Sequence, residues 1–119
     1  MDSTQKKKYV QGWKKREKVK DIKKEKIAEQ AMVKANKIAN LLKKEYKVKE
    51  VILFGSLAEN NFRKESDIDI AIVDYNKKEY LEMFNDVYDI ASPFKIDLLP
   101  LEDASDTLKK RILMKGVKL

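Results

Sequence analysis

The sequence has no cysteine and no histidine among its 119 residues. These two absences exclude disulfide bonds, thiolate zinc sites, imidazole metal ligands and Ser-His-Asp triads. Any metal site in this chain therefore has to be built from oxygen ligands, which are the ligands that Mg²⁺ and Mn²⁺ prefer.

Long apolar runs are absent as well. No stretch approaches the roughly 20 apolar residues of a membrane span, and no signal-peptide core follows the basic start. We therefore expect a cytoplasmic protein without a membrane partner. The length predicts a single domain over residues 1–119, which is long enough to bury a core but too short for two domains.

Positive charge is concentrated at the start of the chain. Residues 1–50 contain 17 Lys/Arg and 7 Asp/Glu, whereas residues 51–119 contain 10 and 13. Residues 1–25 form a basic N-terminal arm, which could attract RNA or an acidic partner protein. Because acidic residues are interleaved and the lysines do not keep to one face, we favour a solvated Lys-rich helix. Trp13 could stack on a base, anchor a partner or fold back on its own domain.

Hydrophobic periodicity predicts an α/β (α+β) protein with elements in the order α-β-β-α-β-α. A frayed start up to about Tyr9 precedes the first helix. The expected elements are helices at about 13–46, 77–91 and 105–115, and strands at about 47–54, 66–74, 94–99 and 117–119. In the last helix we expect Asp103 or Ser105 as N-cap, with Leu108, Ile112 and Leu113 facing inward.

The most informative feature is a pair of apolar runs that carry polar residues at fixed places. Gly55-Ser56 comes directly after the apolar run Val51–Phe54, and Asp67 and Asp69 lie two positions apart at the start of the next run. In a strand, these two carboxylates share one face while the intervening isoleucines point to the other. Neighbouring carboxylates raise each other's pKa unless a cation lies between them. The pattern therefore predicts a divalent metal site.

Gly55-Ser56, ten intervening residues and then Asp67-x-Asp69 resemble the Gly-Ser-x10-Asp-x-Asp signature of the DNA polymerase β-like nucleotidyltransferases, in particular their minimal (MNT) branch. Asp97, in the apolar run 94–99, supplies the third acid that the family carries on a later strand. The similarity extends from about residue 28 to residue 119. It implies the nucleotidyltransferase fold, a small mixed sheet packed by helices, for most of the chain.

The resemblance also implies a reaction and roles for the three acids. An acceptor hydroxyl would attack the α-phosphorus of a nucleoside triphosphate, and pyrophosphate would leave. Asp67 and Asp69 would bridge two Mg²⁺ ions, with Mn²⁺ as the alternative. Asp97 would complete the second metal site and act as general base.

The nucleotide-binding residues implied by the resemblance lie around the Gly-Ser pair. Gly55 would let the backbone approach the phosphates, and the Ser56 hydroxyl would donate a hydrogen bond. Ser66 belongs to the same set, although fixing the loop ahead of the Asp-x-Asp is the role we favour for it.

One departure from the family pattern concerns the residues that follow Gly55-Ser56. Family members commonly carry an arginine shortly after this pair, whereas this chain has Leu57-Ala58-Glu59. An acid there would repel a triphosphate if it pointed inward. Arg63 and Lys64, on the same loop, are the expected cationic substitutes.

In the family that the chain resembles, MNT proteins are often antitoxins that adenylylate a HEPN-type ribonuclease toxin, commonly on a tyrosine. The resemblance thus implies ATP as substrate and a toxin as protein partner, in a hetero- or homo-oligomer. Two alternatives stay open. The chain could neutralise a toxin by contact alone, with a vestigial site, or it could transfer a nucleotide to RNA guided by the basic arm.

Overall fold

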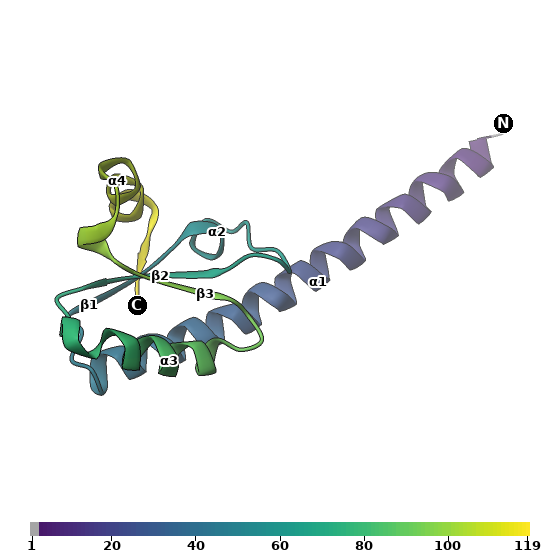
Figure 1. The fold of residues 1–119 in the computed structure, drawn as a ribbon. Coiled ribbons are helices and arrows are strands. Elements are labelled where there is room, and N and C mark those ends of the chain that lie inside the picture. Colours follow the sequence, from purple (N-terminus) through teal and green to yellow (C-terminus); the bar gives the residue numbers. More distant parts are fainter. Residues whose placement is uncertain (1–2) are drawn as a thin grey trace.

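The computed structural model describes the backbone of residues 3–119 and the side chains of residues 23–119. Helix α1 (Ser3–Lys44) begins well before the expected start near Trp13, in place of the frayed segment expected up to Tyr9. Its N-terminal half extends away from the rest of the chain (Figure 1). The roles considered for Trp13 concern a side chain outside the described residues. Within the described part of the chain, no helix is both long and apolar enough to cross a membrane.

Four strands form one mixed sheet, as the sequence predicts. They are β1 (Glu50–Phe54), β2 (Ile68–Val73), β3 (Ile96–Pro100) and β4 (Val117–Lys118). Their spatial order is β3-β2-β1-β4. β1 pairs antiparallel with β2 and β4, whereas β2 and β3 are parallel and are connected through helix α3 (Tyr80–Ala91). The remaining helices are α2 (Gly55–Ala58) and α4 (Asp106–Lys115), and short 3₁₀ turns lie at Lys77–Glu79 and Leu101–Asp103.

One face of the sheet is covered by α1 and α3, which run side by side below it (Figure 1). The apolar side chains of α1 recur every three or four residues, so they form a single buried stripe. Its fully buried members include Ala31, Ala35, Ile38 and Leu42. They pack with the isoleucines of β2 in the larger hydrophobic core. The three-to-four spacing of apolar residues therefore accounts for the face of α1 that is buried.

The opposite face of the sheet is covered in part by α4. Ser105 is its N-cap, because the Ser105 hydroxyl accepts a hydrogen bond from the Leu108 amide (3.2 Å). Ile112 is buried and packs on a smaller core with Ile52 and Phe54 of β1. Leu113, which the sequence analysis expected to face inward, is 62% exposed. That expectation is wrong because a helix turns by about 100° per residue, so Leu113 leaves the sheet when Ile112 points into it.

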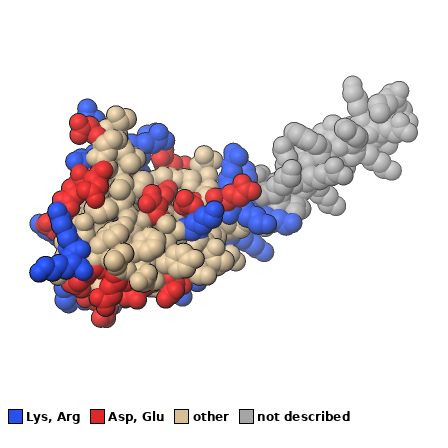
Figure 2. Space-filling view, in the orientation of Figure 1, with Lys and Arg blue, Asp and Glu red and all other residues tan. Residues whose placement is uncertain are grey.

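Charge is mixed over the described surface. Figure 2 shows acidic and basic side chains interspersed, with acidic ones gathered along the lower edge of the view, where α3 lies in Figure 1. The exposed acids of α3 are Glu82, Asp86 and Asp89. The excess of positive charge in residues 1–50 is therefore not continued as a uniform basic surface on this face.

Candidate active site

The three predicted aspartates lie where β2 and β3 begin. Asp69 of β2 is the register partner of Asp97 on the parallel strand β3, and Asp67 directly precedes β2. Register partners on neighbouring strands point to the same face and are about 4.8 Å apart. The fold thus brings together two carboxylates that are 28 residues apart in the sequence, with the third two positions away.

Asp69 is the innermost of the three carboxylates. Its side chain is half-buried, whereas Asp67 and Asp97 are exposed. Burial raises the pKa of Asp69 to about 6, and the charges of Asp97 and Asp67 add to this effect. The ionised Asp69 carboxylate is therefore held in a place that disfavours its charge, and it would gain from a cation beside it.

Gly55 lies directly against this carboxylate. It follows β1, whose last residue Phe54 is paired with Asp69. Its φ of +74° lies in the left-handed region, which favours glycine. A Cβ built on Gly55 would lie 2.2 Å from Oδ2 of Asp69. The side chain of Asp69 thus leaves room only for glycine at position 55, a contact that could not be predicted from the sequence.

The chemistry of the three carboxylates fits a hard divalent cation. All their donors are oxygens, and the charge of Asp69 is unfavourable without a counter-ion. In the arrangement described for residues 23–119, no three acidic side chains come together closely enough to hold an ion. The two exposed aspartates would therefore have to turn toward Asp69 when a cation binds.

Ser66 has a clear local contact. Its hydroxyl accepts a hydrogen bond from the Arg63 amide (3.0 Å), and its own amide donates to the Arg63 carbonyl (2.9 Å). These two bonds close a turn just ahead of Asp67. They support the loop-fixing role favoured for Ser66 over a contact with nucleotide.

Arg63 and Lys64 do not line the hollow of about 270 Å³ that lies beside the Gly-Ser pair. Arg63 lines a different hollow, of about 480 Å³, between the loop after α2 and helix α1. Lys64 is exposed and lines neither this hollow nor the one beside the Gly-Ser pair. The cationic substitutes expected from the sequence therefore do not line the same hollow as Gly55 and Ser56.

A hollow of about 270 Å³ does lie beside the Gly-Ser pair, and its other wall is α4. From the β1–α2 side it is lined by Phe54, Gly55, Ser56, Glu59 and Asn61, and from α4 and the residue after it by Leu108, Arg111, Ile112, Lys115 and Gly116. Arg111 and Lys115 are not among the site residues predicted from the sequence. Their spacing of four residues places them on one helix face, which was the available signal. Nothing in the sequence showed that this face meets Gly55.

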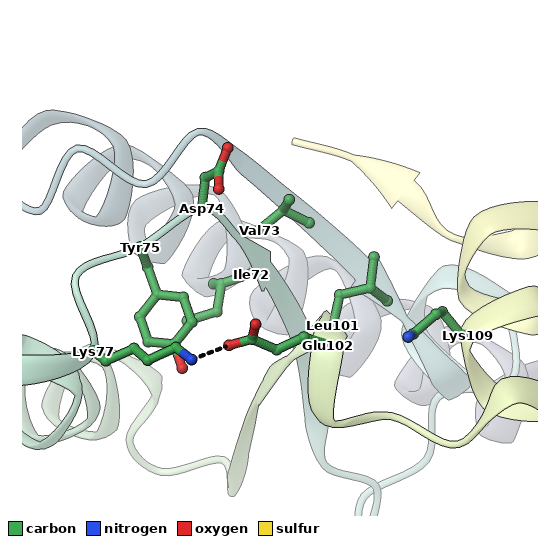
Figure 3. A pocket seen from close by; sticks show the side chains of 8 residues that line it. All are labelled: Ile72, Val73, Asp74, Tyr75, Lys77, Leu101, Glu102 and Lys109. Carbon is green, nitrogen blue, oxygen red and sulfur yellow. Dashed lines mark ion pairs between the residues drawn. The ribbon is translucent and has the colours of Figure 1, made fainter.

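A further hollow, of about 320 Å³, lies at the other end of β2 (Figure 3). Its two acids are Asp74 and Glu102, and both are paired with lysines. Glu102 lies 3.4 Å from Lys77, the pair marked by the dashed line, and Asp74 lies 3.8 Å from Lys49. Both acids of this hollow therefore have a basic partner, whereas no ion pair of the three aspartates at the start of β2 and β3 is found among residues 23–119.

Comparison with known proteins agrees with this geometry. Residues 36–119 match the family described as Polymerase beta, Nucleotidyltransferase. Two proteins of Methanocaldococcus jannaschii to which protein adenylyltransferase activity is ascribed are similar to parts of the chain. MJ0128 is 46% identical over 44 residues, which are 37% of this chain and 45% of that protein. MJ1215 is 38% identical over 60 residues, which are 49% of this chain and 70% of that protein. The chain thus spans less than half the length of MJ0128.

Solved structures give the same picture. A toxin–antitoxin crystal structure with AMP-PNP has a chain that is 28% identical with a TM-score of 0.59, covering 71% of this chain and 70% of that one. A complex of tri-AMPylated Shewanella oneidensis HEPN toxin with MNT antitoxin matches at 26% identity and a TM-score of 0.54, covering 74% and 70%. Because the family match covers residues 36–119, which is more than half of the chain, the chain belongs to the polymerase β nucleotidyltransferase family.

Proposed function

We propose that this protein is a divalent-cation-dependent protein adenylyltransferase that acts as an antitoxin in the cytoplasm. It transfers AMP from ATP to a tyrosine hydroxyl of a HEPN-type partner toxin. The observation that carries this proposal is the pairing of Asp69 with Asp97 across two parallel strands, with Asp67 and Gly55 beside them. The activity ascribed to the archaeal relatives and the toxin complex of the MNT antitoxin support the choice of acceptor.

The residues have separate roles in this reaction. Asp67, Asp69 and Asp97 would hold Mg²⁺ or Mn²⁺, which supplies electrostatic stabilisation of the charge that develops on the phosphoryl oxygens. Asp97 is exposed at the start of β3, so it can accept the proton of the attacking hydroxyl. A bond forms between the tyrosine oxygen and the α-phosphorus, and the bond from that phosphorus to pyrophosphate breaks.

The acceptor can come from another chain. Asp67 and Asp97 are both exposed, so the acceptor side of the site is open among the described residues. A tyrosine carried on a partner protein could reach the carboxylates without any rearrangement of the sheet. A complex with the toxin would also place the hydroxyl and the α-phosphorus together, which is a large part of the catalytic advantage of such a site.

The test is transfer of label from α-³²P-ATP in the presence of Mg²⁺. The protein is incubated alone and with the protein encoded beside it, as wild type, as Asp67→Asn and as Asp74→Asn. Asp74 follows the other end of β2 and is exposed, so Asp74→Asn makes the same chemical change away from the site. We expect label on a tyrosine of the partner with wild type and Asp74→Asn, and a loss of at least about 100-fold with Asp67→Asn.

Two other outcomes would replace the proposal. If Asp67→Asn neutralises the partner as well as wild type does, neutralisation depends on contact alone and the carboxylates are not used. If label instead appears on RNA, and RNA binding falls steeply with salt and is lost on removal of residues 1–20, the acceptor is a nucleic acid.

A further inference from the structure

Glu59 is an acid at a place where the proposed function requires phosphates. It directly follows α2, three residues after Ser56, and lines the same hollow as Gly55 and Ser56. Its side chain is only 22% exposed. An unpaired carboxylate in this position would repel a triphosphate. The hollow can therefore serve a nucleotide only if the charge of Glu59 is compensated within it.

Arg111 of α4 provides this compensation. Its Nε donates to Oε2 of Glu59 (3.2 Å) and its Nη2 donates to Oε1 (2.9 Å). Such a two-point contact fixes the plane of the guanidinium. The Arg111 hydrogen bond also lowers the pKa of Glu59, so the carboxylate stays ionised. The pair uses only part of the donors of the guanidinium, and the Arg111 side chain is 63% exposed. Among residues 23–119 no other hydrogen bond of the guanidinium is found, so its remaining N–H donors are left for a ligand of the hollow that Arg111 lines.

Lys115 adds a second cation one helical turn further along α4. It lines the same hollow, and its charge contributes to the lowered pKa of Glu59. Asn61 and Ser56 supply an amide and a hydroxyl to the polar part of the lining. At about 270 Å³ the hollow is smaller than the roughly 300–1,000 Å³ of sites that enclose a whole drug-sized ligand. Its size and charge suit part of a triphosphate.

We propose that Arg111, assisted by Lys115, binds the terminal phosphates of the nucleoside triphosphate, and that Glu59 is the positioning residue for Arg111. This inference rests on the proposed function, because it states how that site holds its substrate. Gly55 lines the hollow and also touches the Asp69 carboxylate, so phosphates bound here lie next to the candidate metal ligands. The required cation is supplied by α4, and not by the loop that follows the Gly-Ser pair.

The test is calorimetric titration of ATP, AMP and inorganic tripolyphosphate, each with Mg²⁺, into wild type and variants. Arg111→Ala is expected to weaken ATP and tripolyphosphate by at least about tenfold, and AMP by much less because AMP lacks the terminal phosphates. Lys115→Ala should weaken the binding of ATP and of tripolyphosphate by a smaller factor. Lys110→Ala is the matched control. It removes a positive charge from the exposed neighbour of Arg111 that does not line the hollow, and it should bind as wild type does.

A charge exchange tests the positioning role of Glu59. Arg111→Glu places two acids in the hollow and should abolish tripolyphosphate binding. Adding Glu59→Arg restores the pair with its partners exchanged, and binding should return to within about tenfold of wild type. Melting temperatures measured in parallel report on the fold. A pair that is merely structural would change the melting temperature and leave the Kd of the folded protein unchanged.

The outcomes separate this inference from the proposed function. Equal tripolyphosphate affinities of Arg111→Ala and Lys110→Ala would overturn the inference, and AMP transfer by wild type would still uphold the function. Arg111-dependent binding of tripolyphosphate without AMP transfer would support the inference and contradict the function. A wild-type protein that binds neither ATP nor tripolyphosphate would overturn both.

Discussion

A methyl group on Gly55 would lie 2.2 Å from the Oδ2 atom of Asp69. This distance links the end of β1 to the start of β2, where the half-buried carboxylate needs the space that a side chain would fill. The conformation of the Asp69 side chain therefore depends on the absence of a side chain at Gly55. Neither can change without consequences for the other.

Gly55→Ala is expected to damage both stability and activity. The backbone at position 55 has φ +74°, which costs a non-glycine residue about 1 kcal/mol, and the clash with Asp69 adds to that cost. We expect the free energy of unfolding to fall by about 2–3 kcal/mol in urea titrations. AMP transfer should fall at least about 100-fold, because the added methyl group displaces the Asp69 carboxylate from the proposed metal site.

A double-mutant cycle checks the cause of this loss. In an Asp69→Ala background the clashing oxygen is absent. Gly55→Ala should then lower the free energy of unfolding only through the unfavourable backbone conformation, by about 1 kcal/mol. An equal cost in the two backgrounds would show that the side chain of Asp69 is not what requires glycine at position 55.

Asp69→Asn is expected to stabilise the metal-free protein at neutral pH. The pKa of Asp69 is raised to about 6 in the folded protein, against about 3.9 in an unfolded chain. The folded state thus binds the proton more tightly, and stability is full below about pH 4 and is lost as the pH rises through 6. Because the carboxylate is half-exposed, solvent screening reduces the effect to about 1 kcal/mol. The uncharged amide of the variant would avoid this loss, so urea titrations at pH 7.5 should show the gain and those at pH 4 should not.

Two controls accompany this measurement. Asp74→Asn, at the exposed end of β2, should change the free energy of unfolding by less than about 0.5 kcal/mol at both pH values. Added Mg²⁺ should raise the melting temperature of wild type but not that of Asp69→Asn. If the variant is no more stable than wild type at pH 7.5, the charge of Asp69 does not destabilise the folded protein.

Much of the fold follows from local patterns in the sequence. The apolar residues alternate in β2 and recur every three or four residues along α1. Each pattern places the apolar side chains on a single face of its element, so both buried faces are predictable. Strand alternation also predicts that Asp69 points away from the isoleucines of β2, whereas the role of the three aspartates as metal ligands stays a prediction. The register of Asp69 with Asp97 is not predictable from local patterns, since it depends on how α3 returns the chain from β2 to β3.

The contacts made by α4 lie beyond local patterns. Glu59 and Arg111 are 52 residues apart, and their meeting depends on the placement of α4 over the Ile52 side of the sheet. Gly116 contributes to that placement. A Cβ there would lie 2.6 Å from the Cγ2 atom of Ile52, so glycine allows the chain after α4 to pass close to β1. No periodicity in the sequence encodes such a tertiary approach.

Tyr46→Phe is expected to destabilise the protein by about 1 kcal/mol at pH 7. The Tyr46 hydroxyl donates a hydrogen bond to Asp86 and so joins the chain after α1 to α3. This bond, together with burial, raises the pKa of Tyr46 above its usual value of about 10. The raised pKa means that the stabilisation is full below pH 10 and is lost at higher pH, where the unfolded tyrosine ionises first. The gap between wild type and variant in urea titrations should therefore narrow above pH 10.

The control for this prediction is Tyr88→Phe on the same helix as Asp86. Tyr88 is 57% exposed, and among residues 23–119 no hydrogen bond of its hydroxyl is found. The change should cost less than about 0.5 kcal/mol at every pH. If both variants lose the same amount of stability, the Tyr46–Asp86 contact contributes nothing of its own.

Ile112→Ala and Leu113→Ala test how α4 is attached to the sheet. Ile112 is 1% exposed and packs on Ile52 and Phe54, so its truncation should cost about 2–4 kcal/mol. Leu113 is 62% exposed, and its truncation should cost less than about 0.5 kcal/mol. Because Arg111 and Lys115 are carried by the same helix, Ile112→Ala should also weaken tripolyphosphate binding in the fraction that stays folded, whereas Leu113→Ala should not. Equal costs for the two variants in urea titrations would mean that α4 faces the sheet through a different side.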